Sequence, residues 1–167
     1  FGQRYLKQAL EEAIPTLQKL KQQGKIRFFG ITAYPIEVFE QVLSQVEVDT
    51  ILCHNHYTLG DTLLLDLMPL IKEKNVGLIG ASPLGSGLLT ERGAPDWHPA
   101  NENDRTTVKQ AVNFCKERGT SLEKLAIQFA TANKEIPTTL VSTASSMSLK
   151  HNIDWLEEPF DVSLAQQ

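Results

Sequence analysis

The sequence predicts an α/β protein with a parallel sheet, because strand patterns and helix patterns alternate along its 167 residues. Short apolar runs such as 77–81 lack helical periodicity, whereas the longer segments between them place apolar residues three or four positions apart. Glycine and proline separate the two kinds of segment. Helices that alternate with strands in this way serve as crossover connections between parallel strands.

The first third of the chain predicts two helices around one strand. A stripe of apolar residues indicates a helix over 5–23, which Gly24 ends as its C-cap. Pro15 lies inside this helix and predicts a kink or a late start, with Pro15 in the first turn as the second possibility. A strand is expected over 27–32, and a helix over 35–46 begins with a proline in its first turn.

The rest of the chain predicts three more strands, each followed by one or two helices. The strands are expected at 50–53, 77–81 and 138–141, and the helices at 61–74, 104–118, 121–133 and 146–157. Asp61 or Thr62 is expected to cap the helix over 61–74. We expect residues 1–158 to form one domain and residues 159–167 a tail without regular structure.

The segment ASPLGSGLLT, residues 81–90, is the most informative motif of the chain because it puts a glycine-rich loop directly after a strand. Gly85 and Gly87 let the backbone approach a ligand closely, and Ser82 and Ser86 add hydroxyl groups. Successive amides in such a loop can cradle a phosphate. A simple tight turn is the alternative, since short glycine patterns are common in connections. The loop as a whole, 82–103, is longer than usual, which favours a functional role.

Composition and charge favour a soluble protein of the cytoplasm without nucleic-acid partners. Hydrophobic residues make up 41% of the chain, charged residues 22%, and the formal net charge is −4. Lysine and arginine are scattered among acidic residues, so there is no basic run to follow a phosphate backbone. No apolar stretch approaches the length of a membrane span. Two cysteines, Cys53 and Cys115, predict reduced core thiols.

The pair His54 and His56 raises the alternative of a metal site, because alternate residues of a strand point to the same side. A catalytic zinc or iron site needs a third protein ligand, and none follows in a suitable spacing. We therefore expect no metal.

Five phrases in this order resemble the aldo-keto reductase family: GKIRFFGIT (24–32), HNHYTL (54–59), ASPLGSGLLT (81–90), LEKLAIQFATANKEI (122–136) and LVSTASSMSLKHNI (140–153). The resemblance implies an incomplete (β/α)8 TIM barrel that comprises about the last four strand-helix units, since a closed barrel needs about 250 residues. It implies hydride transfer between a nicotinamide and the carbonyl of a sugar or aldehyde. The family's catalytic Asp, Tyr, Lys and His would precede Phe1. No residue here is expected to be catalytic, and the chain would need the missing N-terminal half of the barrel.

The resemblance also implies which residues bind the cofactor. Thr32 and His54 fall where relatives hold the carboxamide, the glycine loop holds the pyrophosphate, and Asn152 falls on the adenine side. The full expected set is Thr32, His54, Ser82, Leu84, Gly85, Ser86, Gly87, Ser142, Thr143, Ser148 and Asn152.

Two departures from the family pattern shape the expected specificity. Many relatives stack a tyrosine on the nicotinamide where this chain has Ala81, and Tyr57 or Trp97 is expected to compensate and to contact substrate. Members that prefer NADP carry Lys and Arg where Ser142 and Ser148 stand here, which implies NAD, with NADP possible through Lys150.

A second hypothesis from another functional class is a non-catalytic relative that uses the barrel to bind regulatory or scaffold partners. A Tyr and a Lys in family context upstream of Phe1 would favour the enzyme. The 167-residue chain itself is expected to show no turnover and to expose unpaired strand edges near Arg27 and Thr138.

Overall fold

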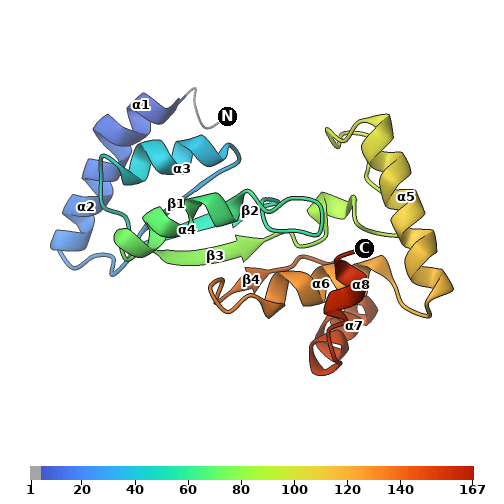
Figure 1. The fold of residues 1–167 in the computed structure, drawn as a ribbon. Helices are drawn as coiled ribbons and strands as arrows, with labels where there is room; N and C mark the ends of the chain where they lie inside the picture. Colours follow the sequence, from blue (N-terminus) through green and yellow to red (C-terminus); the bar gives the residue numbers. More distant parts are fainter. Residues whose placement is uncertain (1–4) are drawn as a thin grey trace.

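Four parallel strands form one sheet in the computed structural model, which describes residues 5–167 (Figure 1). The strands are β1 (Gly30–Ala33), β2 (Thr50–His54), β3 (Gly77–Ala81) and β4 (Thr139–Leu140), and they lie side by side in the order of the chain. All three strand pairs are parallel. The predicted α/β class with a parallel sheet is confirmed.

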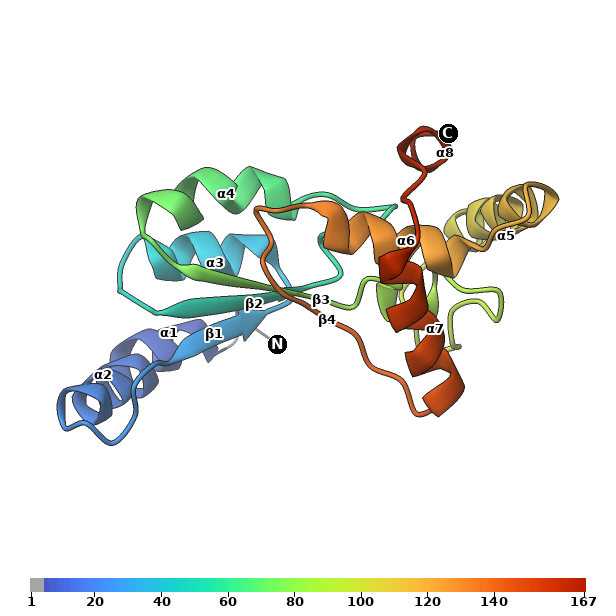
Figure 2. The same cartoon turned by 90° about the horizontal axis from the view of Figure 1, so that it is seen from below.

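Helices connect the strands. They are α1 (Leu6–Gln8), the π-helical segment η2 (Ala9–Ala13), α2 (Ile14–Gln22), α3 (Ile36–Leu43), α4 (Leu64–Glu73), the single 3-10 turn η3 (Gly85–Gly87), α5 (Glu102–Glu117), α6 (Leu122–Ala132), α7 (Ser146–Glu157) and α8 (Val162–Ala165). Figure 2 shows α3 and α4 on one face of the sheet. In both views α5, α6 and α7 gather beyond the carboxyl end of β3.

The strand register divides the sheet into a covered face and an open face. Ile51, Cys53 and Leu78 are buried and belong to the core that includes Phe39 of α3 and Leu67 of α4. Alternate residues point to the opposite face, where Thr32, Leu52 and Ile79 form one row across β1, β2 and β3. None of these three is buried. Helices on one face only are what a segment of a barrel wall requires, because the other face lines the barrel interior.

Pro15 shapes the first helix through the backbone of the preceding turn. The helix is continuous from Leu6 to Gln22, but residues Ala9–Ala13 follow a π-helical path that ends two residues before the proline. The proline ring has no N–H and crowds the carbonyl four residues earlier, so the wider turn relieves a clash. The predicted distortion is therefore present as a π-helical segment, and Pro15 lies in the first turn of α2, as the second possibility had it. Gly24, with φ +69°, ends the helix as predicted.

The first strand is shorter than predicted and begins later. Residues 27–29 were expected in the strand, but β1 starts at Gly30. The carboxylate of Asp49 accepts a hydrogen bond from the Phe29 amide at 3.0 Å, so a side chain satisfies a group that a strand would pair. Phe28 is 67% exposed. The apolar run alone could not reveal this competing partner.

Two other expectations about helix ends and the tail are wrong. Neither Asp61 nor Thr62 caps α4, whose N-cap is Leu63; Asp61 lies in a turn and accepts from the Leu63 amide at 2.9 Å. The expected irregular tail contains α8, which Asp161 caps by accepting from the Leu164 amide. Leu164 packs on the second core, so tertiary contacts order a segment that has no clear periodicity.

Two apolar clusters hold the fold. The first lies between the sheet and α2, α3 and α4, and the second joins the glycine loop to α5, α6 and the tail. Leu84 packs against the second cluster and Leu89 is buried in it. This packing anchors the segment that follows β3.

Candidate functional site

The carboxyl ends of the strands bring several polar and aromatic side chains together on the open face. His54 and Ala81 are register partners at the ends of β2 and β3, and Tyr34 follows β1 directly beside His54. The rings of Tyr34 and His54 have centroids 5.4 Å apart. In barrels, ligand chemistry is located at this end of the strands.

The glycine loop after β3 is a tight left-handed structure. Gly85, Ser86 and Gly87 have φ values of +56°, +53° and +97°. An L residue is strained at such torsions, whereas glycine adopts them freely. Ser86 carries this backbone strain. Asn55 after β2 and Ser82 after β3 carry it too, with φ of 65° and 61°. Strain of this kind concentrates at ligand-binding segments.

The amides of the glycine loop differ in whether they already have a hydrogen-bond partner. The amide of Gly85 donates to the Ser82 carbonyl at 2.9 Å, and that of Gly87 donates to the Leu84 carbonyl at 3.0 Å. Ser82 uses its amide for the Leu140 carbonyl, which continues the pairing of β3 with β4. Within residues 5–167, the amides of Leu84 and Ser86 have no hydrogen-bond partner. These two N–H groups are left for a ligand such as an anion, whereas the amides of Gly85 and Gly87 are used inside the turn.

Neighbouring loops hold the glycine loop in place. The Asn55 amide nitrogen donates to the Ser86 hydroxyl at 3.0 Å, and the hydroxyl donates back to the Asn55 side-chain oxygen at 3.2 Å. His98 Nε2 donates to the Gly85 carbonyl at 3.0 Å, while His98 Nδ1 accepts from the Ala100 amide. His98 is thus a neutral imidazole that ties the segment 94–100 to the glycine loop.

Arg105 of α5 organises that same segment. Its guanidinium donates to the carbonyl oxygens of Ala94, Pro95, His98 and Ala100 at 2.9 to 3.2 Å. The long loop is therefore a built structure. Sequence reasoning missed Arg105 because a single arginine in a helix carries no signal of the carbonyls that will surround it.

Burial sets the ionisation of the groups on β2. The pKa of His54 lies below its usual value, first because burial disfavours the charged imidazole and second because His56 is near. Burial also raises the pKa of the Cys53 thiol to about 12, which makes it inert. His56 Nδ1 lies 2.9 Å from the Asp61 carboxylate, and Nε2 lies 2.6 Å from the Tyr34 carbonyl oxygen. With both ring nitrogens engaged, His56 has no lone pair for a metal. Over residues 5–167 no group of three or more His, Cys, Asp and Glu side chains could hold a metal ion.

The structure places Tyr57 and Trp97, the two aromatic residues expected near substrate, in different surroundings. The Tyr57 ring stacks on Phe129 of α6 at 4.9 Å, and its hydroxyl accepts from Asn133 at 3.1 Å. Trp97 is 73% exposed on the loop before α5. The ring beside His54 is that of Tyr34. The sequence holds a signal for it, because Tyr34 is the residue that directly follows β1.

The segment between β4 and α7 gathers small hydroxyl residues at a helix N-terminus. Ser145 caps α7 by accepting from the Ser148 amide at 3.2 Å, and Thr143 Oγ1 accepts from the Ser145 amide at 3.1 Å. Ser142 is exposed, and Asn152, one helical turn beyond Ser148, is buried. Lys150 pairs with Asp154 at 2.6 Å on the exposed side of the helix.

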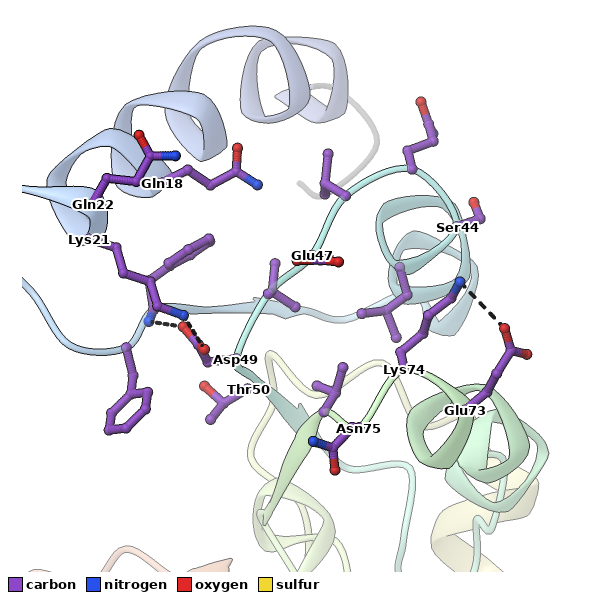
Figure 3. A pocket seen from close by; sticks show the side chains of 17 residues that line it. Gln18, Lys21, Gln22, Ser44, Glu47, Asp49, Thr50, Glu73, Lys74 and Asn75 are labelled. Atoms are coloured by element: carbon purple, nitrogen blue, oxygen red, sulfur yellow. Dashed lines mark hydrogen bonds and ion pairs between the residues drawn. The ribbon is translucent and has the colours of Figure 1, made fainter.

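An open hollow of about 1300 Å³ lies at the opposite, amino ends of the strands (Figure 3). Its polar lining includes Lys21, which points at Asp49, and the neighbouring pair Glu73 and Lys74. Lys21 and the Phe29 amide hold the pKa of the Asp49 carboxyl below its usual value. These contacts join α2 to the start of β1 and β2, and this end of a barrel serves stability rather than chemistry.

Between residues 5 and 167, no helix is both long enough and apolar enough to span a membrane.

The sequence profile of the Aldo/keto reductase family matches residues 4–166, and the chain belongs to that family. The chain is 46% identical over 165 residues to the L-galactose dehydrogenase of Arabidopsis thaliana, with 97% of this chain and 52% of that protein covered. It is 27% identical over 129 residues to the D-arabinose 1-dehydrogenase of Saccharomyces cerevisiae, with 71% of this chain and 38% of that protein covered. The chain thus spans about half the length of L-galactose dehydrogenase and less of the yeast enzyme.

Solved structures agree on the fold. The holo form of aldo-keto reductase AKR11C1 from Bacillus halodurans superposes with a TM-score of 0.71 at 22% identity, over 94% of this chain and 55% of that one. The thermostable aldo-keto reductase Tm1743 gives 0.63 at 18% identity, over 94% and 53%. The predicted partial TIM barrel of the family is confirmed.

Proposed function

We propose that this chain is the cofactor-binding half of an NAD-dependent oxidoreductase that resembles L-galactose dehydrogenase and acts in the cytoplasm on a sugar or related aldehyde. One observation carries the proposal. The glycine loop at the carboxyl end of β3 is held in a left-handed turn and leaves the amides of Leu84 and Ser86 without a partner among the described residues. Such a pair of amides suits a pyrophosphate.

The residues around the loop fit the other parts of a dinucleotide. Thr32 and His54 lie on the open face at the ends of β1 and β2, where they would hold the carboxamide. Ser142, Thr143 and Ser148 at the start of α7, with buried Asn152, would face the adenosine side. A bound nicotinamide dinucleotide would accept or donate the hydride. The groups that move the proton would come from the preceding half of the barrel.

The proposed preference for NAD over NADP rests on the start of α7. Ser142 and Ser148 offer no positive charge there, and Lys150 is engaged by Asp154 on an exposed surface. A 2'-phosphate would find no fixed guanidinium in this segment, whereas arginine is the favoured partner of phosphate.

The test measures cofactor binding by the full-length protein that contains this chain. Fluorescence quenching on titration with NADH and with NADPH reports the two affinities. We expect NADH to bind more tightly, and Gly87→Ala to weaken NADH binding by about tenfold or more because the loop turn changes. Gly93→Ala is the matched control, since Gly93 also has a positive φ of 77° and its added Cβ would meet nothing within 4 Å. Sugar oxidation with NAD⁺ is then measured directly.

Two outcomes would contradict the proposal. Absence of NADH and NADPH binding by the full-length protein would favour the scaffold hypothesis. Equal effects of Gly87→Ala and Gly93→Ala would show that the glycine loop acts only as a turn.

A further inference from the structure

His56 is a buried imidazole whose two nitrogens both face oxygen atoms. Only 6% of the residue is exposed. Nε2 lies 2.6 Å from the carbonyl oxygen of Tyr34, which can only accept, so this nitrogen carries a hydrogen. Nδ1 lies 2.9 Å from Oδ2 of Asp61, whose other oxygen accepts from the Leu63 amide. A neutral imidazole has one N–H and can donate to only one of these partners.

The second proton of this pair belongs on the histidine. An oxygen atom faces each ring nitrogen, the Asp61 carboxylate at Nδ1 and the Tyr34 carbonyl at Nε2, and an N–H at both positions satisfies both oxygens. The favoured state is therefore an imidazolium that donates to both Asp61 and Tyr34. A buried charge of this kind persists only when it is paired and hydrogen-bonded, and both conditions hold here.

The His56–Asp61 pair holds the backbone of Tyr34, the residue that follows β1 at the carboxyl end of the strands. Its carbonyl is held by His56, and its ring centroid lies 5.1 Å from that of His56 and 5.4 Å from that of His54. A cation within about 6 Å of an aromatic ring attracts it. The Tyr34 residue nevertheless stays 51% exposed, so part of the ring is open to a ligand.

We propose that Tyr34 is the aromatic wall against which the flat nicotinamide ring packs, and that the ion pair between buried His56 and the partly exposed Asp61 positions it. This inference rests on the proposed NAD function. Ala81, the register partner of His54 on β3, is too small to serve as a wall. The Tyr57 ring is already stacked on Phe129. Tyr34 is the aromatic ring in contact with His54.

The first experiment measures NADH affinity, kcat and KM for the full-length protein and three variants. We expect Tyr34→Ala to weaken NADH binding by about three- to tenfold, the range that an aromatic contact contributes. Tyr34→Phe keeps the ring and should stay within about twofold of the wild type. Phe28→Ala removes an exposed aromatic residue at the other end of β1 and should leave binding unchanged.

The outcomes separate the two proposals. If the wild type does not bind NADH, the proposed function fails and this inference fails with it. If the wild type binds and Tyr34→Ala binds equally well, the function stands and the aromatic wall is wrong.

The second experiment tests the positioning pair by nitrogen NMR of the His56 ring near neutral pH. Both ring nitrogens should show the signature of N–H groups, a result that needs no variant. Asp61→Asn should convert the ring to the neutral form and weaken NADH binding toward the value of Tyr34→Ala. Asp66→Asn, an exposed carboxylate on α4, should change neither property. One unprotonated nitrogen in the wild-type ring would overturn the assignment.

Discussion

His54 illustrates at the scale of one residue how burial selects a chemical state. Its imidazole sits partly buried at the end of β2, and both burial and the neighbouring His56 lower its pKa. It is therefore predominantly neutral near pH 7, with one donor and one acceptor. A neutral ring can hydrogen-bond an amide of either orientation, which is the property the proposed carboxamide contact needs.

This shift predicts a pH dependence of stability. Because the folded protein resists protonation of His54, the unfolded chain binds more protons as the pH falls below the usual histidine pKa. The contribution is fully present above that pKa and is lost as pH falls through the lower folded value. Urea unfolding between about pH 7.5 and about pH 5.5 should therefore show a smaller loss for His54→Gln than for the wild type.

The control for this measurement is His151→Gln, on the exposed side of α7. It should lose stability over that interval as the wild type does. An identical pH dependence in the wild type and His54→Gln would mean that His54 is not perturbed in solution.

At the scale of elements, the pairing of β1 with β2 depends on the absence of a side chain at Gly30. A Cβ placed there would lie 2.1 Å from the Thr50 hydroxyl and 2.4 Å from the Thr50 carbonyl oxygen. The second contact is with backbone and cannot be relieved by a rotamer change. Gly30 therefore sets how closely these strands approach.

Gly30→Ala should destabilise the protein by about 1–3 kcal/mol, the usual cost of forcing an extra methyl group into a packed site. Chemical denaturation measures the effect. Gly60→Ala is the matched control, because its Cβ would meet nothing within 4 Å and it should change stability little. Equal stability of the two variants would show that β1 shifts away at no cost.

At the scale of the whole molecule, the sheet has two unpaired edges and one open face. β1 and β4 are the edge strands, and Leu140 on β4 is 47% exposed. Helix α7 exposes an apolar set alongside it: Met147, Leu149, Ile153 and Leu156. Exposed strand edges with apolar neighbours promote pairing between chains.

The 167-residue chain expressed by itself should therefore self-associate, whereas the full-length protein should not do so through these edges. Sedimentation velocity across a dilution series measures this. Leu140→Lys should reduce the association, because a charge blocks pairing at an edge. Leu63→Lys, at another exposed leucine ahead of α4, serves as the control. A monomer at every concentration would contradict the prediction.

Sequence patterns were sufficient for elements whose local signals agree with their packing. Residues 77–81 form β3 and residues 146–157 form α7 as expected, and Ser121 caps α6. Predictions failed where a group outside the predicted element competed with the local signal. The Asp49 carboxylate accepts the hydrogen bond of the Phe29 amide, so Phe29 is not part of β1. The Asp61 carboxylate contacts His56 and does not cap α4.

The candidate site divides in the same way. The order of glycine, serine and proline after β3 was enough to mark the loop, because these residues determine backbone torsions locally. The sequence could not show that the glycine amides are used inside the turn, or that Asn55 and His98 hold it. Those facts depend on groups that approach from other elements.

By itself the sequence determined the family, the alternation of strands and helices, and the place of the glycine loop, because these follow from short-range periodicity and backbone preference. Only the tertiary structure decided which side chains meet at the strand ends. Tyr34 follows β1, whereas His54, His56 and Asp61 lie within residues 54–61, and parallel pairing of β1 with β2 in a fixed register brings these two segments together. Register and burial are properties of the assembled sheet, so the chemistry of these residues is settled only once it has formed.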